Sequence, residues 1–243
     1  MNFNDNKVII ITGAASGIGK SCVEILSEEN TIIIAADISY PMNEFHELHN
    51  QVFTFGLDVS KPQSWKLLIH KIEENFSEVY ALINCAGISS RDKVISGELD
   101  EWEKVIHTNV LGPYLGMKYC IPSMLKHKNG AIINLSSVGA HVGIGGGTVY
   151  PASKGAIYSM SKRVANDYGK ENIRVNVVTP GWIKTNMTKN ARKEKEQQFL
   201  ERQALKFIGE PIDVAEMIKF LISDKARFIT GAEFIVDGGF TCC

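Results

Sequence analysis

Two side chains that can move protons stand one helical turn apart near the middle of the chain. Tyr150 and Lys154 are separated by four residues in the segment Tyr-Pro-Ala-Ser-Lys, and this spacing places both on the same side of a helix. A phenol is a weak acid at neutral pH, but a fixed ammonium beside it favours the phenolate and lowers its pKa. We therefore expect Tyr150 to serve as a general acid and base, with Lys154 adjusting its pKa.

The spacing alone does not single out this pair, because two other tyrosine–lysine pairs in the chain share it. The segment that precedes Tyr150 distinguishes this pair from the other two. An apolar run over 131–136 predicts a buried strand, and Ser137 follows it directly. The carboxyl ends of strands line the ligand crevice of open α/β sheets. Pro151 suits the first turn of a helix, so we expect Tyr150 at a helix entrance that faces this crevice.

A glycine-rich turn follows the first predicted strand, over 8–11. Glycines in such a turn, between a strand and a helix, let the backbone approach a pyrophosphate that sits on the helix N-terminus. A tight turn that binds nothing is the alternative. The predicted contacts in this turn are Gly13, Ser16, Gly17, Ile18 and Gly19.

An acid closes the second predicted strand, over 31–36. Asp37 lies eighteen residues after Gly19, close to the position where dinucleotide-binding proteins hold the adenosine ribose with a carboxylate. The carboxylate would repel a 2′-phosphate, and no basic residue stands between the first two glycines. We therefore predict NAD rather than NADP as the cofactor. The alternative is that Asp37 only caps a helix or a turn.

Size and composition indicate one intracellular domain. The chain has 243 residues with a net charge of −1 and no linker or repeat, so we expect a single domain over 1–243, no nucleic-acid or membrane partner, and a cytoplasmic location. The five cysteines lack metal-ligand spacing, so we expect reduced thiols and no metal site. Strands alternate with helices seven times in the pattern, which predicts a doubly wound parallel α/β sheet with helices on both faces.

Two further segments bear on the site. A helical pattern over 99–126 is interrupted near 109–113, where Gly and Pro suggest a kink; Asn109 lies there, either as an inward-facing structural amide or in a catalytic role. The segment 182–210 is the most polar of the chain. We interpret it as a solvated helix face and, over about 183–210, as a lid above the substrate.

Taken together, these motifs resemble the short-chain dehydrogenase/reductase family over essentially the full length, in its single-domain branch with a Rossmann-like fold. The resemblance implies a tetrad in which Tyr150 exchanges a proton, Lys154 lowers its pKa and holds the nicotinamide ribose, Ser137 steadies the substrate oxygen, and Asn109 positions a water. It also implies cofactor contacts beyond the glycine turn at Asp58, Val59, Asn84, Ala86, Gly87, Pro180, Gly181, Ile183 and Thr185.

Departures from the family pattern narrow the substrate. Cys85 stands where an asparagine is common, and a small side chain there should leave cofactor binding intact. Gly139 and Gly147 occupy positions where relatives acting on hydroxybutyrate carry a histidine and a lysine. The two glycines therefore argue against hydroxybutyrate as the substrate. Fatty-acid-synthesis reductases usually take NADP and use arginines to bind the acyl carrier. Glu171 stands where one of these arginines would fall, which argues against such a reductase.

We accordingly predict an NAD-dependent oxidoreductase that interconverts a secondary alcohol and a ketone. The alternatives are an NADP-dependent 3-oxoacyl-type reductase, a non-catalytic dinucleotide-binding protein, and an enzyme that uses S-adenosylmethionine, which would have no use for Tyr150 and Lys154. By resemblance we expect a homotetramer formed through helices near 110–126 and 151–169. The expected substrate walls are Ser89, Arg91, His141, Trp182 and Met187.

Overall fold

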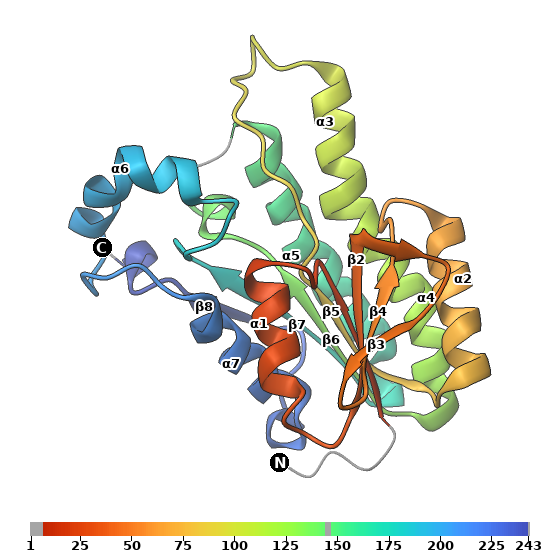
Figure 1. The fold of residues 1–243 in the computed structure, drawn as a ribbon. Helices are drawn as coiled ribbons and strands as arrows, with labels where there is room; N and C mark the ends of the chain where they lie inside the picture. Colours follow the sequence, from red (N-terminus) through yellow and green to blue (C-terminus); the bar gives the residue numbers. More distant parts are fainter. Residues whose placement is uncertain (1–6, 144–146, 243) are drawn as a thin grey trace.

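An eight-stranded sheet forms the centre of the molecule (Figure 1). The computed structural model describes residues 7–143 and 147–242. Within these residues, neighbouring strands run parallel except for β3, which is antiparallel to β4. The order across the sheet is β3-β4-β2-β1-β5-β6-β7-β8. The strands are β1 (Val8–Thr12), β2 (Ile32–Met42), β3 (His46–His49), β4 (Val52–Gly56), β5 (Val79–Asn84), β6 (Gly130–Leu135), β7 (Ile173–Pro180) and β8 (Glu233–Val236).

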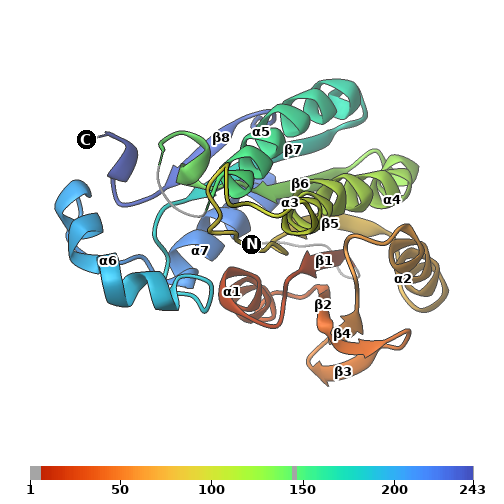
Figure 2. The same ribbon diagram turned by 90° about the horizontal axis from the view of Figure 1, so that it is seen from above.

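Helices cover both faces of this sheet, as the view from above shows (Figure 2). One face carries α1 (Gly17–Leu26) and α7 (Pro211–Ile222), and the other carries α2 (Pro62–Asn75), α4 (Gly112–His127) and α5 (Val149–Tyr168). Two helices, α3 (Leu99–Ile106) and α6 (Lys189–Arg202), lie beyond the carboxyl edge of the strands (Figure 1). No helix in the described part of the chain is long and apolar enough to cross a bilayer.

The alternation of side chains along the strands explains this layering. In β1, Ile9 and Ile11 join the core under α1 and α7, whereas Val8 and Ile10 join the core on the opposite face, and all four are fully buried. A strand that is apolar on both sides needs cover on both sides. The predicted doubly wound α/β fold is therefore confirmed, and the carboxyl ends of its parallel strands meet at one edge.

The prediction of a regular strand–helix alternation was wrong between the second and third predicted strands. No helix lies there; β2 continues to Met42 and the chain returns as the short antiparallel strand β3. Pro41 opposes a helix in this segment, and Asn43 turns the chain with a left-handed φ of 72°. Gly56 is required where β2 crosses the end of β4, because a Cβ there would lie 2.6 Å from the Pro41 carbonyl oxygen.

The helical segment after β5 contains an irregular turn rather than a break. Residues His107–Leu111 form one π-helical turn between α3 and α4, so the helical path continues from 99 to 127. Asn109 lies in this turn and is completely buried. A π-turn inserts one extra residue into a helix, often at a functional site, and here it directs the Asn109 amide inward.

Candidate active site

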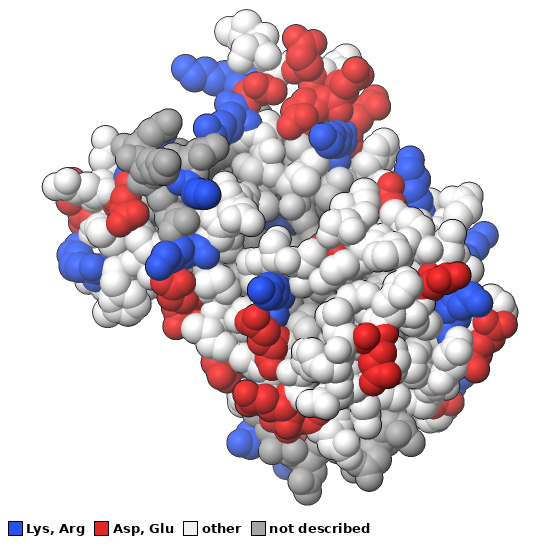
Figure 3. All heavy atoms as spheres, in the orientation of Figure 1, with Lys and Arg blue, Asp and Glu red and all other residues white. Residues whose placement is uncertain are grey.

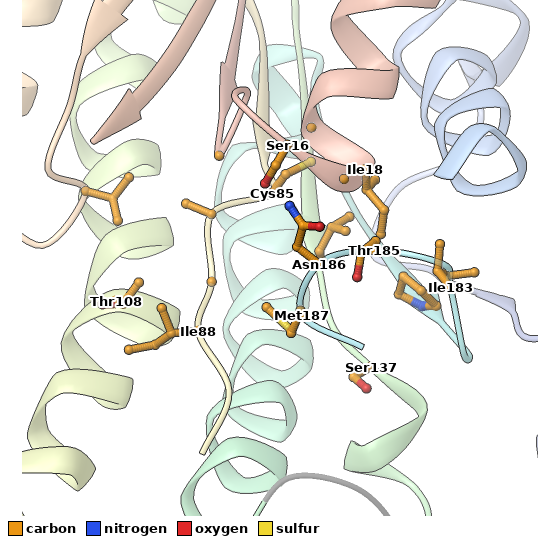
Figure 4. Close-up of a pocket in the computed structure, with 18 of the residues that line it drawn as sticks. Ser16, Ile18, Cys85, Ile88, Thr108, Ser137, Ile183, Thr185, Asn186 and Met187 are labelled. Atoms are coloured by element: carbon orange, nitrogen blue, oxygen red, sulfur yellow. The ribbon is translucent and has the colours of Figure 1, made fainter. Parts of the chain in front are cut away.

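A pocket of about 480 Å³ opens where the carboxyl ends of the strands meet the first turns of α1 and α5. Figure 4 shows the segment with Thr185, Asn186 and Met187 on one side of it and Ile88 and Thr108 on another. The pocket brings together most of the residues predicted from sequence: Gly13, Ser16, Gly17, Ile18, Gly19, Asp37, Asp58, Val59, Ala86, Gly87, Ser137, Tyr150, Lys154, Pro180, Gly181, Ile183, Thr185 and Met187.

The glycine turn after β1 is shaped for close approach of a ligand. Gly13 has a left-handed φ of 66°, and a Cβ there would lie 2.8 Å from the Ala86 backbone nitrogen. The Ala86 N–H donates to the Thr12 hydroxyl at 3.1 Å, which ties the ends of β1 and β5 together. No side chain caps the N-terminus of α1. The first N–H groups of α1 could therefore donate hydrogen bonds to an anionic group of a ligand, such as a pyrophosphate.

Hydrogen bonds fix the Asp37 carboxylate beside this turn. One carboxylate oxygen accepts from the Ala15 N–H at 3.2 Å, and the other accepts from the Ser39 N–H at 2.9 Å and the Ser39 hydroxyl at 2.8 Å. Because Asp37 lies within β2, it is not a helix N-cap. Among the described residues that line the pocket, the cations are Lys104 and Lys154.

The end of β6 and the start of α5 are locked together by a reciprocal pair of hydrogen bonds. The Lys154 ammonium donates to the Leu135 carbonyl oxygen at 2.8 Å, and the Ser136 hydroxyl donates to the Lys154 carbonyl oxygen at 3.0 Å. Ser136 is thereby occupied in holding α5. Ser137 lines the pocket with Tyr150 and Lys154, and its hydroxyl accepts from the Gly139 N–H at 3.2 Å.

Burial dominates the acid–base properties of this group. Loss of hydration raises the pKa of Tyr150, and a hydrogen bond with Ser137 opposes that rise. Burial also lowers the pKa of Lys154 from 10.5 to about 8, against a smaller electrostatic effect of Cys85. The main causes that act on the Tyr150 pKa here are burial and Ser137, so the lowering of that pKa by Lys154 stays a prediction. The ammonium lies 5.9 Å from the centre of the Tyr150 ring and bonds to a carbonyl instead.

Asn109 lies behind the pocket rather than in its wall. Its side-chain oxygen accepts from the Ile88 N–H at 2.9 Å, and its side-chain nitrogen donates to the Ile88 carbonyl at 2.9 Å and the Ser153 hydroxyl at 3.0 Å. Ser153 in turn donates to the Tyr150 carbonyl at 2.7 Å. The structural-amide interpretation thus describes these contacts, and they connect the loop after β5 to the backbone of Tyr150.

Five other predicted residues do not line the pocket. The Asn84 side chain is buried and donates to the Asn134 side chain at 2.7 Å, so it joins β5 to β6. Ser89 and Arg91 are exposed in the loop after β5. His141 pairs with Glu233 on β8 at 2.7 Å, and buried Trp182 packs on Phe199 of α6.

Several lining residues were missed from the sequence. Most of their side chains belong to no motif, so their type does not separate them from core or surface positions. Two signals were present: Cys85 lies between Asn84 and Ala86 in the predicted cofactor turn, and the i, i+4 spacing of Lys104 and Thr108 places them on one helix face. The missed residues are Ile38, Leu57, Cys85, Ile88, Lys104, Thr108, Leu135, Ser136, Asn186 and Thr188.

Known proteins resemble this chain over almost its whole length. The family model described as enoyl-(acyl carrier protein) reductase matches residues 13–241. The chain is 35% identical over 240 residues to a 3-oxoacyl-[acyl-carrier-protein] reductase of Thermotoga maritima, covering 97% of this chain and 98% of that one. It is 34% identical over 247 residues to a meso-2,3-butanediol dehydrogenase of Serratia marcescens, covering 98% and 95%.

A solved structure shares the fold closely. The aldohexose dehydrogenase of Thermoplasma acidophilum superimposes with a TM-score of 0.88 at 32% identity, over 98% of this chain and 95% of that one. The fold and site define a dinucleotide-binding oxidoreductase of alcohols and ketones in general. The chain belongs to the short-chain dehydrogenase/reductase family.

Proposed function

We propose that this protein is an NAD-dependent dehydrogenase that interconverts an uncharged secondary alcohol and its ketone. One observation carries the proposal: Ser137, Tyr150 and Lys154 line the same pocket as the glycine turn and Asp37. A proton-transfer group, a dinucleotide cradle and a ribose-binding acid thus share one space. When bound, NAD supplies the acceptor for a hydride from the carbinol carbon.

The preference for NAD rests on charge near the ribose end of the pocket. Asp37 presents a carboxylate that is already fixed by Ala15 and Ser39. Such a group would accept hydrogen bonds from ribose hydroxyls and repel a 2′-phosphate. Ser16, which lines the same pocket, offers no positive charge to offset that repulsion.

Proton transfer is assigned to Tyr150. Its raised pKa keeps the phenol protonated at neutral pH, which suits donation to the oxygen of a ketone; in the reverse direction the phenolate removes the hydroxyl proton. Ser137 steadies the substrate oxygen, and the Lys154 ammonium favours the phenolate as it forms. Together these groups would contribute roughly 10²–10⁴-fold to the rate. Asn109 and Ser153 hold the backbone of Tyr150, and the relay role of Asn109 stays a proposal.

The substrate walls favour an uncharged compound. The apolar side chains of Ile88 and Met187 line the pocket together with Ser137 and Tyr150. Arg91 lies outside the pocket, and Lys104 is the lining cation other than Lys154 among the described residues. We propose that residues 183–210 act as a lid: Thr185 and Met187 already line the pocket, and Phe199 anchors α6 between Trp182 and Phe240.

A second candidate is an NADP-dependent 3-oxoacyl reductase, favoured by the name of the Thermotoga maritima relative. Negative charge on the surface of α3 speaks against an acidic carrier. Acidic side chains gather over α3, where Asp100 and Glu101 occupy the first turn (Figure 3), and Asp37 disfavours the 2′-phosphate. Binding without catalysis is less favoured because Ser137, Tyr150 and Lys154 are all present.

The test is a panel of vicinal diols, cyclic alcohols, aldohexoses, hydroxy acids and a 3-oxoacyl thioester, each assayed with NAD(H) and separately with NADP(H). The proposal expects turnover of at least one uncharged secondary alcohol with NAD. Turnover of the thioester alone, with NADPH, would establish the second candidate. A homotetramer and a cytoplasmic location remain part of the proposal, and light scattering of the purified protein tests the former.

A further inference from the structure

The side chain of Ser153 is completely buried near the start of α5, between Asn109 and the backbone of Tyr150. Its hydroxyl accepts a hydrogen bond from the Asn109 side-chain nitrogen at 3.0 Å and donates its own proton to the Tyr150 carbonyl oxygen at 2.7 Å. Ser153 does not line the pocket, and a hydroxyl has only one proton to donate. Any effect of Ser153 on the reaction must therefore pass through its neighbours.

The other end of this chain of hydrogen bonds lies at the pocket wall. Asn109 binds both the N–H and the carbonyl oxygen of Ile88, each at 2.9 Å, and Ile88 lines the pocket together with Gly87. A Cβ at Gly87 would lie 3.3 Å from the Asn109 side-chain oxygen and 3.5 Å from the Lys154 ammonium nitrogen. Both protons and the oxygen of the Asn109 amide are engaged, so the amide is held in one orientation.

We propose that Ser153 is a positioning residue that couples the pocket wall at Ile88 to the placement of the Tyr150 phenol. Three successive hydrogen bonds join Ile88 to the Tyr150 carbonyl oxygen by way of the Asn109 and Ser153 side chains. A shift of the loop after β5 therefore moves the start of α5 with it. A bound dinucleotide would contact this loop, a step that rests on the proposed function, and would thereby set the phenol against Ser137 before proton transfer.

The start of α5 is tied to the same loop at a second point. The Asp92 carbonyl oxygen accepts from the Thr148 N–H at 3.0 Å, whereas the side chain of Thr148, the N-cap residue, makes no capping hydrogen bond. Helix ends are the part of a helix that frays most readily. The bond from Ser153 to the Tyr150 carbonyl oxygen thus holds a turn in which a displacement of about 1 Å can slow a reaction about 100-fold.

The test compares Ser153→Ala with Ser161→Ala, a matched control in the same helix of the full chain. Ser161 is also buried, accepts from the Asn134 side chain at 2.8 Å and donates to the Ile157 carbonyl oxygen at 2.7 Å. Neither Ser161 nor Ile157 lines the pocket. Each variant removes a buried hydroxyl that links an asparagine amide to the backbone of α5, so denaturant titration should find a similar loss of stability in both.

The two variants should differ in the chemical step. Single-turnover hydride transfer should slow by roughly 10–100-fold in Ser153→Ala but by less than about twofold in Ser161→Ala. NADH affinity should stay close to the parent's in both, because the loop keeps its bonds to Asn109. The pH profile of alcohol oxidation should move to higher pH in Ser153→Ala alone, since a displaced phenol loses the hydrogen bond with Ser137 that lowers its pKa.

A double variant tests whether Ser153 acts through Asn109. If it does, Asn109→Ala combined with Ser153→Ala should be no slower than Asn109→Ala alone, and losses that multiply would contradict the coupling. A Ser153→Ala variant with the parent's rate and pH profile, or an equal slowing in Ser161→Ala, would overturn this inference and leave the proposed function standing. A parent that transfers no hydride with either cofactor would defeat the proposed function and this inference with it.

Discussion

The Lys154 ammonium donates a hydrogen bond to the Leu135 carbonyl oxygen at 2.8 Å, from the first turns of α5 to the last residue of β6. This bond holds a buried cation at the strand end from which Ser137 reaches the pocket. Lys154 is only 6% exposed, and burial lowers its pKa to about 8. The position is therefore maintained at a cost to stability, which indicates a role in function rather than in folding.

Replacement of Lys154 by methionine should remove activity without unfolding the protein. The fall in pKa from 10.5 to about 8 corresponds to a cost of about 3 kcal/mol at about 1.4 kcal/mol per unit. The unpaired Leu135 carbonyl would offset about 1–3 kcal/mol of that gain. Denaturant titration at pH 7 should find Lys154→Met as stable as the parent or up to about 2 kcal/mol more stable, with turnover reduced by at least roughly 100-fold.

The lowered pKa of Lys154 also predicts how the stability difference between the parent and Lys154→Met depends on pH. Below pH 8 the lysine is charged in both the folded and the unfolded state, so its burial cost is fully present. Between about 8 and 10.5 the unfolded chain binds more protons than the folded one, and the parent gains stability relative to Lys154→Met. A stability difference that stays constant from pH 7 to 10 would contradict this account.

The pH dependence of ketone reduction follows from the pKa shifts of Tyr150 and Lys154. Tyr150 stays protonated across neutral pH because burial raises its pKa, whereas Lys154 loses its charge near pH 8. The reduction rate at saturating NADH should therefore fall as the pH rises through about 8. Alcohol oxidation, which needs a deprotonated tyrosine, should increase over the same range. Stopped-flow absorbance of NADH in both directions measures these profiles.

Asp37→Ser should change the cofactor preference. The substitution removes the charge that opposes a 2′-phosphate and the carboxylate that accepts from Ala15 and Ser39. Fluorescence titration should show NADH binding weakened roughly 10–100-fold and NADPH binding strengthened. Asp58→Ser, at an acid that also lines the pocket, provides the matched control, and an equal response of both variants would argue against a specific role for Asp37.

Glu233→Ala should loosen the loop that carries Ser137. The Glu233 carboxylate accepts from the Thr179 hydroxyl at 2.5 Å and pairs with His141 at 2.7 Å, so it ties the turn after Ser137 to the end of β7. Its loss should cost about 1–3 kcal/mol of stability and raise the KM for the alcohol. Glu47→Ala, on the exposed strand β3, is the control. A variant with the parent's KM and melting temperature would show that this contact positions nothing.

The parallel sheet and most of the pocket were predictable because they follow from side-chain type and order along the chain. The apolar strands, the glycine turn and the Tyr150–Lys154 spacing together predict a site at the carboxyl edge of the sheet. The roles of the buried amides were harder to predict. The residue type of Asn84 and Asn109 does not reveal whether the side chain contacts a ligand or a neighbouring part of the protein. Strand β3 was missed since its exposed side chains, such as His46 and Glu47, lack an apolar alternation.

The acid–base balance could not be read from spacing at all. It depends on how much water the fold removes from Tyr150 and Lys154, because desolvation is the largest cause of the pKa shift of each group.

The most direct test of the central claim is single-turnover hydride transfer in Tyr150→Phe, measured with the alcohol that the substrate panel identifies. The phenylalanine keeps the packing of the ring but cannot exchange a proton. We expect NADH to bind with the parent's affinity and hydride transfer to slow by roughly 10²–10⁴-fold. A variant that binds NADH normally and transfers hydride at the parent's rate would contradict the assignment of Tyr150 as the general acid and base.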